Sequence, residues 1–446
     1  MGRPMESSER RSGGLARKLG TFEAVTIGIG GMIGGAIFEA IGVAAGIAGP
    51  SLVLTFCLGA VMAALTGYSY GKLGARFPEA GGSFSYISRA FKGRGFRVMM
   101  GYLIWFAYIA AAALYSLGFT SYARVFLPWL PQPVVMLALV LGFTWVNLRG
   151  VKETGMAQNL MVSLKVSILL LLVSVGWGAV DFDNYVPLFP FGPANTLLAI
   201  GIIFIGYEGF DIIGTSGEEL NDPAKQIPRS IFISIAIVSF LYISVSAVSI
   251  GVLGYRGLQE ASAPLTAVAE RSFGRMGAVV LGLGGVFSTA SAFNAAMYGA
   301  SRVAYSLGRN NVLPKKACEL SRSAAPAVAI VSTGGLIALL AIASLASYEA
   351  VKFAASLSSA SFMFVFLLVN LANYRLRHIT RPNRWLMWTT IALYVFSMAI
   401  LYVADPMSWL LVGAWVLAAF VLDFGLRSRL IGLFYYKEEE LSQDLS

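Results

Sequence analysis

Charged residues are scarce in this chain of 446 residues, because only 13% are Asp, Glu, Lys or Arg. A soluble domain usually carries about 25%. Cysteine and histidine are scarcer still, at two and one residues, which excludes a disulfide framework and a Cys/His metal cluster. No nucleophile–base set or group of metal ligands stands out either. We therefore expect neither an enzyme nor a bound cofactor or metal.

Apolar residues make up 57% of the chain, and runs of about twenty of them recur along its whole length. The sequence therefore predicts an all-α integral membrane protein embedded in the lipid bilayer. We predict twelve spans, at residues 22–47, 51–75, 97–127, 133–149, 157–179, 195–217, 229–254, 276–308, 325–346, 350–374, 384–403 and 406–426.

The net charge of +10 raises the possibility of nucleic-acid binding. Of the 33 lysines and arginines, however, 27 lie in the two tails and in or near alternate short segments between the predicted spans, as membrane orientation requires. We therefore expect no nucleic-acid partner, and a multi-pass protein of the plasma membrane with both termini in the cytoplasm. The first apolar segment has no cleavage site and is expected to be retained.

Glycine interrupts two of the predicted spans. Residues 26–38 read TIGIGGMIGGAIF, and residues 201–217 read GIIFIGYEGFDIIGTSG. Glycine favours unwinding, and unwound backbone at membrane depth is tolerated only where it faces a protein-enclosed cavity. Interrupted segments at matching positions of two halves indicate a transporter site, although close helix packing would also explain the glycines. Because five spans separate the two segments, the halves should be inverted repeats.

This organisation predicts five regions of the chain. They are a cytoplasmic N-terminal tail (1–21), a first five-helix repeat (22–179), a second inverted five-helix repeat (180–374), two further helices (375–426) and a cytoplasmic C-terminal tail (427–446). The loop segments 77–91, 217–230 and 306–317 could each be a plain solvated turn. The outer loop 257–273 could hold a short amphipathic helix.

Five motifs carry a resemblance to a known family: GxGxMIGxxIF from residue 28, FPEAGGSFSY from 77, FIGYEGFD from 204, EELNDPAKQIPR from 218 and SLGRNNVLP from 306. The chain resembles the amino acid–polyamine–organocation (APC) superfamily from Phe22 to about Asp423, and is most similar to its proton-coupled ApcT-type amino acid transporters. The resemblance implies a leucine-transporter-like fold with helices 1 and 6 broken, and amino acid import by proton symport through alternating access. An exchanger of amino acids or polyamines without net proton coupling is the alternative.

A helix that resumes after a break exposes free N–H groups, which attract an anion. Here those groups would bind the carboxylate of an amino acid, and the carbonyls that end the first half would accept from its ammonium group. The resemblance implies that Ile205 forms a gate over the substrate, and that Tyr207, Glu208 and Phe210 lie in the unwound stretch of helix 6. The predicted substrate-binding residues are Met32, Gly34, Gly35, Ala36, Ile205, Tyr207, Glu208 and Phe210.

Two acids, Glu208 and Asp211, lie inside the second interrupted span. An ionisable residue inside a membrane span is expected to be functional. Glu208 could contact a substrate or carry a proton, and it could equally cap backbone N–H groups freed by the break. Asp211 is expected to brace the start of the second half-helix, where an acid offsets the helix dipole.

Lys165 lies about 12 Å inside its predicted span, at 1.5 Å per residue. Placing a lysine there costs roughly 2.5–3.5 kcal/mol, and extension of the side chain to the interface is the alternative. The resemblance implies that its ammonium group stands where sodium-coupled relatives bind their ion. It would face the carbonyl of Gly30 and the hydroxyls of Ser288 and Ser291 in helix 8. These four residues form the predicted proton-coupling site.

Overall fold

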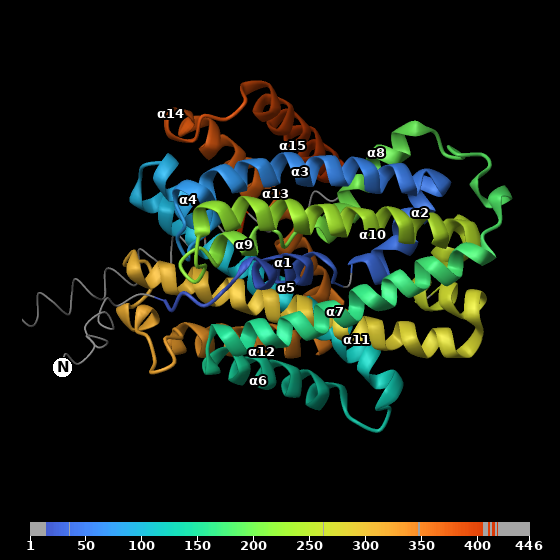
Figure 1. The fold of residues 1–446 in the computed structure, drawn as a ribbon, viewed down its shortest axis with the longest axis horizontal. Helices are drawn as coiled ribbons and strands as arrows, with labels where there is room; N and C mark the ends of the chain where they lie inside the picture. Colours follow the sequence, from blue (N-terminus) through green and yellow to red (C-terminus); the bar gives the residue numbers. More distant parts are fainter. Residues whose placement is uncertain are drawn as a thin grey trace, which may run out of the picture.

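The structure is a computed structural model that describes residues 15–34, 36–261, 263–346 and 348–404, together with positions 409, 410, 413, 414 and 417. Within these ranges it is helical, and the only β-type pairing is an isolated parallel bridge between Leu19 and Leu220. Figure 1 shows long helices lying side by side along the length of the molecule. The predicted all-α class is confirmed.

Helices of very different lengths build the bundle. The α-helices are α1 (Thr21–Met32), α2 (Ile41–Ala48), α3 (Leu52–Arg76), α4 (Ser83–Ala90), α5 (Arg94–Phe126), α6 (Gln132–Arg149), α7 (Val151–Gly176), α8 (Pro193–Ile203), α9 (Ile212–Thr215), α10 (Pro223–Glu260), α11 (Pro264–Arg309), α12 (Ala327–Ala346), α13 (Tyr348–Arg375), α14 (Arg377–Thr380) and α15 (Arg384–Ala404). A π-helix covers Ala36–Ala40, and turns of 3₁₀-helix cover Gly49–Ser51, Trp177–Ala179, Phe182–Tyr185, Phe204–Tyr207 and Lys315–Cys318.

Seven helical segments of the described residues are long and apolar enough to cross a membrane. They are Ile41–Arg76, Arg94–Phe126, Gln132–Arg149, Val151–Ala179, Pro223–Glu260, Pro264–Arg309 and Ala327–Ala346. The chain is therefore a multi-pass membrane protein. The first and sixth predicted spans are each divided into shorter helices, and the twelfth, 406–426, lies outside the described residues except for single positions. The number twelve and the inverted repeat stay predictions.

Burial separates central helices from peripheral ones. In α5, 78% of the most apolar stretch is buried inside the protein, whereas in α6 the share is 28%. Helix α5 therefore lies in the core of the bundle, and α6 presents most of its apolar surface outward, as expected for a helix that faces lipid. In Figure 1, α6 lies at the margin of the bundle.

Two loop segments contain more structure than plain turns. In segment 77–91, α4 buries Phe84, Tyr86 and Ile87 completely, so the solvated-turn interpretation is wrong there. The amphipathic helix expected within 257–273 is present as the first part of α11, which bends at Gly274 (φ +70°). His378 is exposed in α14, as a solvated residue should be.

Candidate functional site

The first interrupted segment breaks at Ile33 rather than along its whole glycine run. Helix α1 continues through Gly30 and Gly31 to Met32, and Ile33 then leaves helical geometry (φ −80°, ψ 83°). The N–H of Gly34 bonds back to the Met32 carbonyl at 3.0 Å, and helical structure resumes as a π-helix from Ala36. The break is thus a short turn between two helical pieces.

The second break lies between α8 and α9 and packs directly on the first. Gly209 has φ +115°, and a Cβ atom added there would lie 2.4 Å from the backbone carbon of Gly31. Only glycine permits this backbone contact. For Gly31 and Gly209 the packing explanation of the glycines therefore holds. Asp211, fully buried, accepts hydrogen bonds from the Gly209 N–H at 3.1 Å and from the Tyr108 hydroxyl.

A small cavity lies between the two breaks. Its volume is about 10 Å³, which is room for about one water molecule. The lining residues are Gly31, Tyr108, Ala111, Tyr115, Glu208, Gly209, Ile212, Ala292, Ala296 and Phe362. Gly34 lies close by, because a Cβ atom on it would be 2.8 Å from Cε1 of Tyr115.

The predicted substrate-binding residues divide into two groups in the structure. Glu208 lines the cavity, and its side chain is 5% exposed. The Tyr207 hydroxyl instead donates to the Phe56 carbonyl in α3 at 2.9 Å, and Phe210 stacks on Phe366 of α13. Side-chain contact of Tyr207 and Phe210 with a ligand in the cavity is not supported by these positions, because both side chains are fixed elsewhere.

Three of the predicted positions are described incompletely. Gly35 lies outside the described residues, and only the backbone is described at Ala36 and Ile205. Ala36 begins the π-helix, and Ile205 lies in the 3₁₀-helix that follows α8.

Lys165 is fully buried in α7, and its ammonium group meets three acceptors. Nζ donates to the carbonyls of Gly30 (3.2 Å) and Ile33 (2.5 Å) and to the hydroxyl of Ser291 (2.8 Å). A protonated lysine has three N–H donors, so this set satisfies it completely. All three acceptors are neutral, and no carboxylate of the described residues lies within ion-pair distance. The structure thus brings α7, α11 and the α1 break together.

Ser288 belongs to the same cluster, although its hydroxyl bonds to the Ile33 carbonyl and not to Lys165. Its hydroxyl donates to the Ile33 carbonyl at 2.9 Å, and Ser291 donates to the Ser288 carbonyl at 2.9 Å. Thr289, one residue on, bonds only to carbonyls of its own helix, those of Gly285 (2.7 Å) and Val286 (3.2 Å). The hydroxyls of Ser288 and Ser291 thus take part in this cluster, whereas the hydroxyl of Thr289 does not.

A chain of amides that sequence reasoning missed continues from Ser291. Gln158 donates to the Ser291 carbonyl (3.1 Å), Asn294 donates to Gln158 (2.8 Å), and Asn147 donates to Asn294 (3.1 Å). Gln158 precedes Lys165 by seven residues, so two helical turns place both side chains on one face of α7. That spacing was the available signal.

Tyr242 of α10 was also missed, and it connects both breaks. Its hydroxyl lies 2.8 Å from the carbonyl of Met32 and 3.0 Å from the carbonyl of Gly206, so one hydrogen is shared between them. The Met32 carbonyl, predicted to face a ligand, therefore already has a partner. Nothing in the sequence around Tyr242 distinguishes it from an ordinary tyrosine in an apolar helix.

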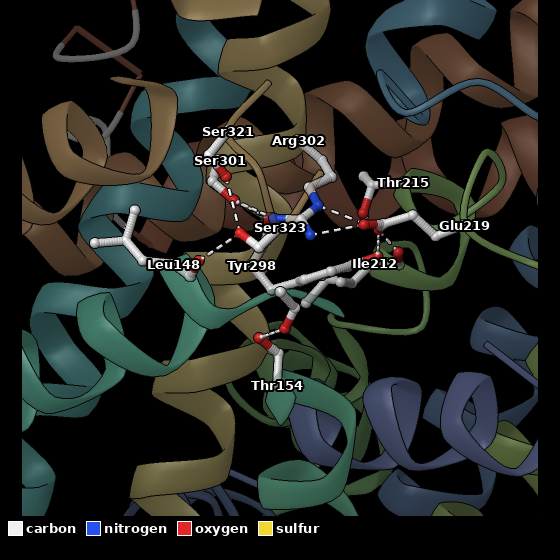
Figure 2. A network of polar contacts seen from close by, with 11 residues as sticks. Leu148, Thr154, Ile212, Thr215, Glu219, Tyr298, Ser301, Arg302, Ser321 and Ser323 are labelled. Carbon is white, nitrogen blue, oxygen red and sulfur yellow. Dashed lines mark hydrogen bonds and ion pairs between the residues drawn. The ribbon is translucent and has the colours of Figure 1, made fainter. Parts of the chain in front are cut away.

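The third missed feature is a buried ion pair (Figure 2). Arg302 in α11 donates to both carboxylate oxygens of Glu219, at 2.7 and 3.2 Å, and the Tyr298 hydroxyl also donates to this carboxylate. The guanidinium carbon lies 4.2 Å from the centre of the Tyr298 ring. Glu219 and Arg302 are almost completely buried, so segment 217–230 is not a plain solvated turn.

Glu219 also connects the two interrupted segments at the end of the bundle where α1 begins. Its backbone carbonyl accepts from the N–H groups of Lys18 and Leu19, both at 2.9 Å, just before α1 begins. The residue therefore links the entry to α1, the loop after α9, and α11. A movement of α1 relative to α11 at this end must break some of these bonds.

Comparison with known proteins identifies relatives over most of the chain. The sequence profile described as amino acid permease matches residues 19–418. An uncharacterized protein of Methanocaldococcus jannaschii is 36% identical over 80% of this chain and 82% of its own. The methylthioribose transporter of Bacillus subtilis is 30% identical over 70% of this chain and 72% of its own length. The branched-chain amino acid permease BcaP of the same organism is 27% identical over 67% of this chain and 69% of its own length.

Proposed function

Since the chain belongs to the amino acid permease family and is a transporter rather than an enzyme, we propose that it imports amino acids by proton symport through alternating access. The proposal includes twelve spans in a five-plus-five inverted repeat with two further helices. It places the protein in the plasma membrane with both termini in the cytoplasm, as the distribution of basic residues favours. Amino acid transport is the family's activity, and coupling to a proton goes beyond it.

The observation that carries the proposal is the set of neutral acceptors around Lys165. With its proton, the amine donates three hydrogen bonds and ties α7 to the α1 break and to Ser291 of α11. Without the proton, one donor becomes a lone pair that faces an acceptor oxygen, and the remaining bonds lose their charge assistance. Proton release therefore weakens the connection between the break and its neighbours. A two-state equilibrium biased in this way is what coupling requires.

The substrate would lie between the breaks, held mainly by backbone groups. The N–H groups of Gly34, Gly35 and Ala36 would bind the carboxylate, which requires the Gly34 N–H to leave the Met32 carbonyl, and Met32 would offer that carbonyl once Tyr242 also moves. The cavity must widen to admit an amino acid, because its present volume is about 10 Å³. Glu208 faces this space and is proposed to influence the choice between neutral and cationic amino acids.

Uptake into proteoliposomes tests the coupling. With no internal amino acid and an imposed inward proton gradient, the wild type should accumulate labelled substrate, whereas an exchanger would show no uptake. Lys165→Ala should still bind substrate but lose the accumulation. Lys152→Ala, an exposed cation on the same helix, is the matched control and should behave as wild type. Normal gradient dependence in Lys165→Ala, or sodium dependence in the wild type, would contradict the proposal.

Glu208→Gln tests the substrate role separately. It keeps the shape of the side chain and removes its charge, so the ratio of cationic to neutral amino acid uptake should fall. If that ratio and the pH optimum are both unchanged, Glu208 serves only to cap the backbone at the break.

A further inference from the structure

A second and larger cavity lies at one end of α3, away from the breaks. Its volume is about 470 Å³, and it opens between α3, the start of α10, and α14. Its lining residues are Tyr68, Gly71, Lys72, Ala75, Arg76, Ala224, Pro228, Phe232 and Thr380. Figure 1 shows α14 at the same end of the bundle as α4. The transport mechanism described above does not use this cavity.

One wall of the cavity is positively charged. Lys72 and Arg76 lie four residues apart on α3, so both project from the same face of the helix. Neither takes part in an ion pair among the described residues, and the lining contains no acid. The nearest acid at the start of α10, Asp222, pairs with Lys225 at 3.4 Å. Within the part of the chain that the structure describes, no acid pairs with Lys72 or Arg76, and the Lys72 ammonium group lies 5.7 Å from the centre of the Tyr68 ring.

Two further groups favour an anion in this cavity. Ala224 lies in the first turn of α10, at the positive end of the helix dipole, although the N–H groups of the next two residues, Lys225 and Gln226, already bond to the Asp222 carbonyl. The Tyr68 hydroxyl accepts the N–H of Asn383 at 2.9 Å and keeps its own hydrogen to donate. Two cations, a helix N-terminus and a hydroxyl donor thus converge on one space.

A second wall, on α10, is apolar, and exposed residues near it are typical of a membrane boundary. Pro228 and Phe232 of α10 form this wall, and the Phe232 side chain is 42% exposed. Close to the cavity, α15 starts with Trp385 and Trp388, which are 83% and 52% exposed. Exposed tryptophan at a helix start is typical of the interface between lipid tails and water. A ligand here would have its anionic part in the cavity and an apolar part in the bilayer.

We propose that this cavity binds the phosphate group of an anionic phospholipid. The phosphate lies between Lys72, Arg76 and the start of α10, and an acyl chain follows Phe232 into the bilayer. Basic pockets at the membrane surface attract anionic headgroups in this way. A soluble phosphate would use the same cations but gain nothing from the apolar wall.

Native mass spectrometry of the purified full-length protein with added phosphatidylglycerol tests the site. The wild type should retain phosphatidylglycerol in preference to zwitterionic phosphatidylcholine. Lys72→Gln/Arg76→Gln should weaken this binding about tenfold or more, given the contribution of each basic residue near an anionic surface. Lys92→Gln/Arg94→Gln removes the same charge from exposed positions just before and at the start of α5, and should leave binding unchanged.

Each outcome decides the matter. Equal lipid retention by wild type and the Lys72/Arg76 double variant overturns the site, as does an equal loss in the Lys92/Arg94 control. If inorganic phosphate competes fully with phosphatidylglycerol, the ligand is a soluble anion and the lipid assignment is wrong. Should the double variant fail to fold, Lys72→Gln and Arg76→Gln alone should each lose part of the phosphatidylglycerol binding. Wild-type retention of the lipid by both single variants would overturn the site.

Discussion

Lys165 and Arg302 are both completely buried basic side chains, but their partners are of opposite kinds. Arg302 is bound by the carboxylate of Glu219, which also accepts the Tyr298 hydroxyl. Lys165 is bound by two carbonyls and one hydroxyl, all neutral. The two sites lie on the same helix, α11, through Arg302 and Ser291.

This difference separates a structural charge from a removable one. A guanidinium group is always charged, so its burial requires a permanent counter-charge, and breaking the pair leaves a charge uncompensated. An amine can lose its proton, and neutral acceptors then leave no charge behind. We therefore expect the Glu219–Arg302 pair to stabilise one arrangement of the bundle, and the Lys165 cluster to change with protonation.

The largest expected loss of stability follows from removing the charge of the Glu219 carboxylate. Glu219→Gln keeps the side-chain size but leaves Arg302 buried without a counter-charge, which should cost about 3–5 kcal/mol of unfolding free energy. Denaturant unfolding in detergent micelles measures this loss. If Glu219→Gln loses less unfolding free energy than removal of an exposed ion pair would, Arg302 must find another partner. The expected difference in stability between the Arg302 and Lys165 sites would then disappear.

Tyr298→Phe should have the next largest effect on stability. It removes one hydrogen bond to the carboxylate, worth about 1.5–3 kcal/mol for a charged acceptor, and keeps the ring on which Arg302 lies. The same unfolding measurement applies. A loss equal to that of Glu219→Gln would mean that the hydroxyl, rather than Arg302, accounts for most of the cluster's stabilisation.

Lys165→Met should cost less, about 1 kcal/mol, because the desolvation cost of a buried ammonium group offsets most of what its three hydrogen bonds contribute. No charge is left unpaired, and the Ile33 carbonyl keeps the Ser288 hydroxyl as its donor. Lys152→Met, on the exposed face of the same helix, is the control for the change of residue type and should be close to neutral. A cost of the size expected for Glu219→Gln would identify Lys165 as a structural cation, and the proposed coupling would then lose its basis.

Part of this site could be predicted from the amino-acid sequence alone. The position of Lys165 within an apolar run identified it as unusual, and the family resemblance supplied Gly30, Ser288 and Ser291 as its surroundings. The glycine runs identified both interrupted helices. These features are local, because each depends on residue types within a single segment.

The parts that could not be predicted depend on contacts between distant segments or on exact backbone turns. Glu219 and Arg302 are 83 residues apart, and each alone resembles an ordinary loop or interface charge. Tyr207 and Phe210 lie within or just after a 3₁₀ turn, so helical periodicity gives no direction for their side chains. The contacts of Tyr242 depend on how both breaks pack against α10, which no single segment of the sequence specifies.

The smallest expected effect is at the neighbouring acid, Glu218, and it tests whether burial is the cause of the contrast. Glu218 meets Arg309 at 2.7 Å, the same distance as in the buried pair, but its side chain is 19% exposed and that of Arg309 is 50% exposed. Glu218→Gln keeps an oxygen that can accept the Ala80 N–H, so only the charge is lost. Water solvates Arg309 afterwards, and the cost should be about 0–1 kcal/mol and decrease further in high salt. If Glu218→Gln instead destabilises the protein as much as Glu219→Gln does, the distance between the charges matters more than their burial, and the low cost expected for Lys165→Met would need another explanation.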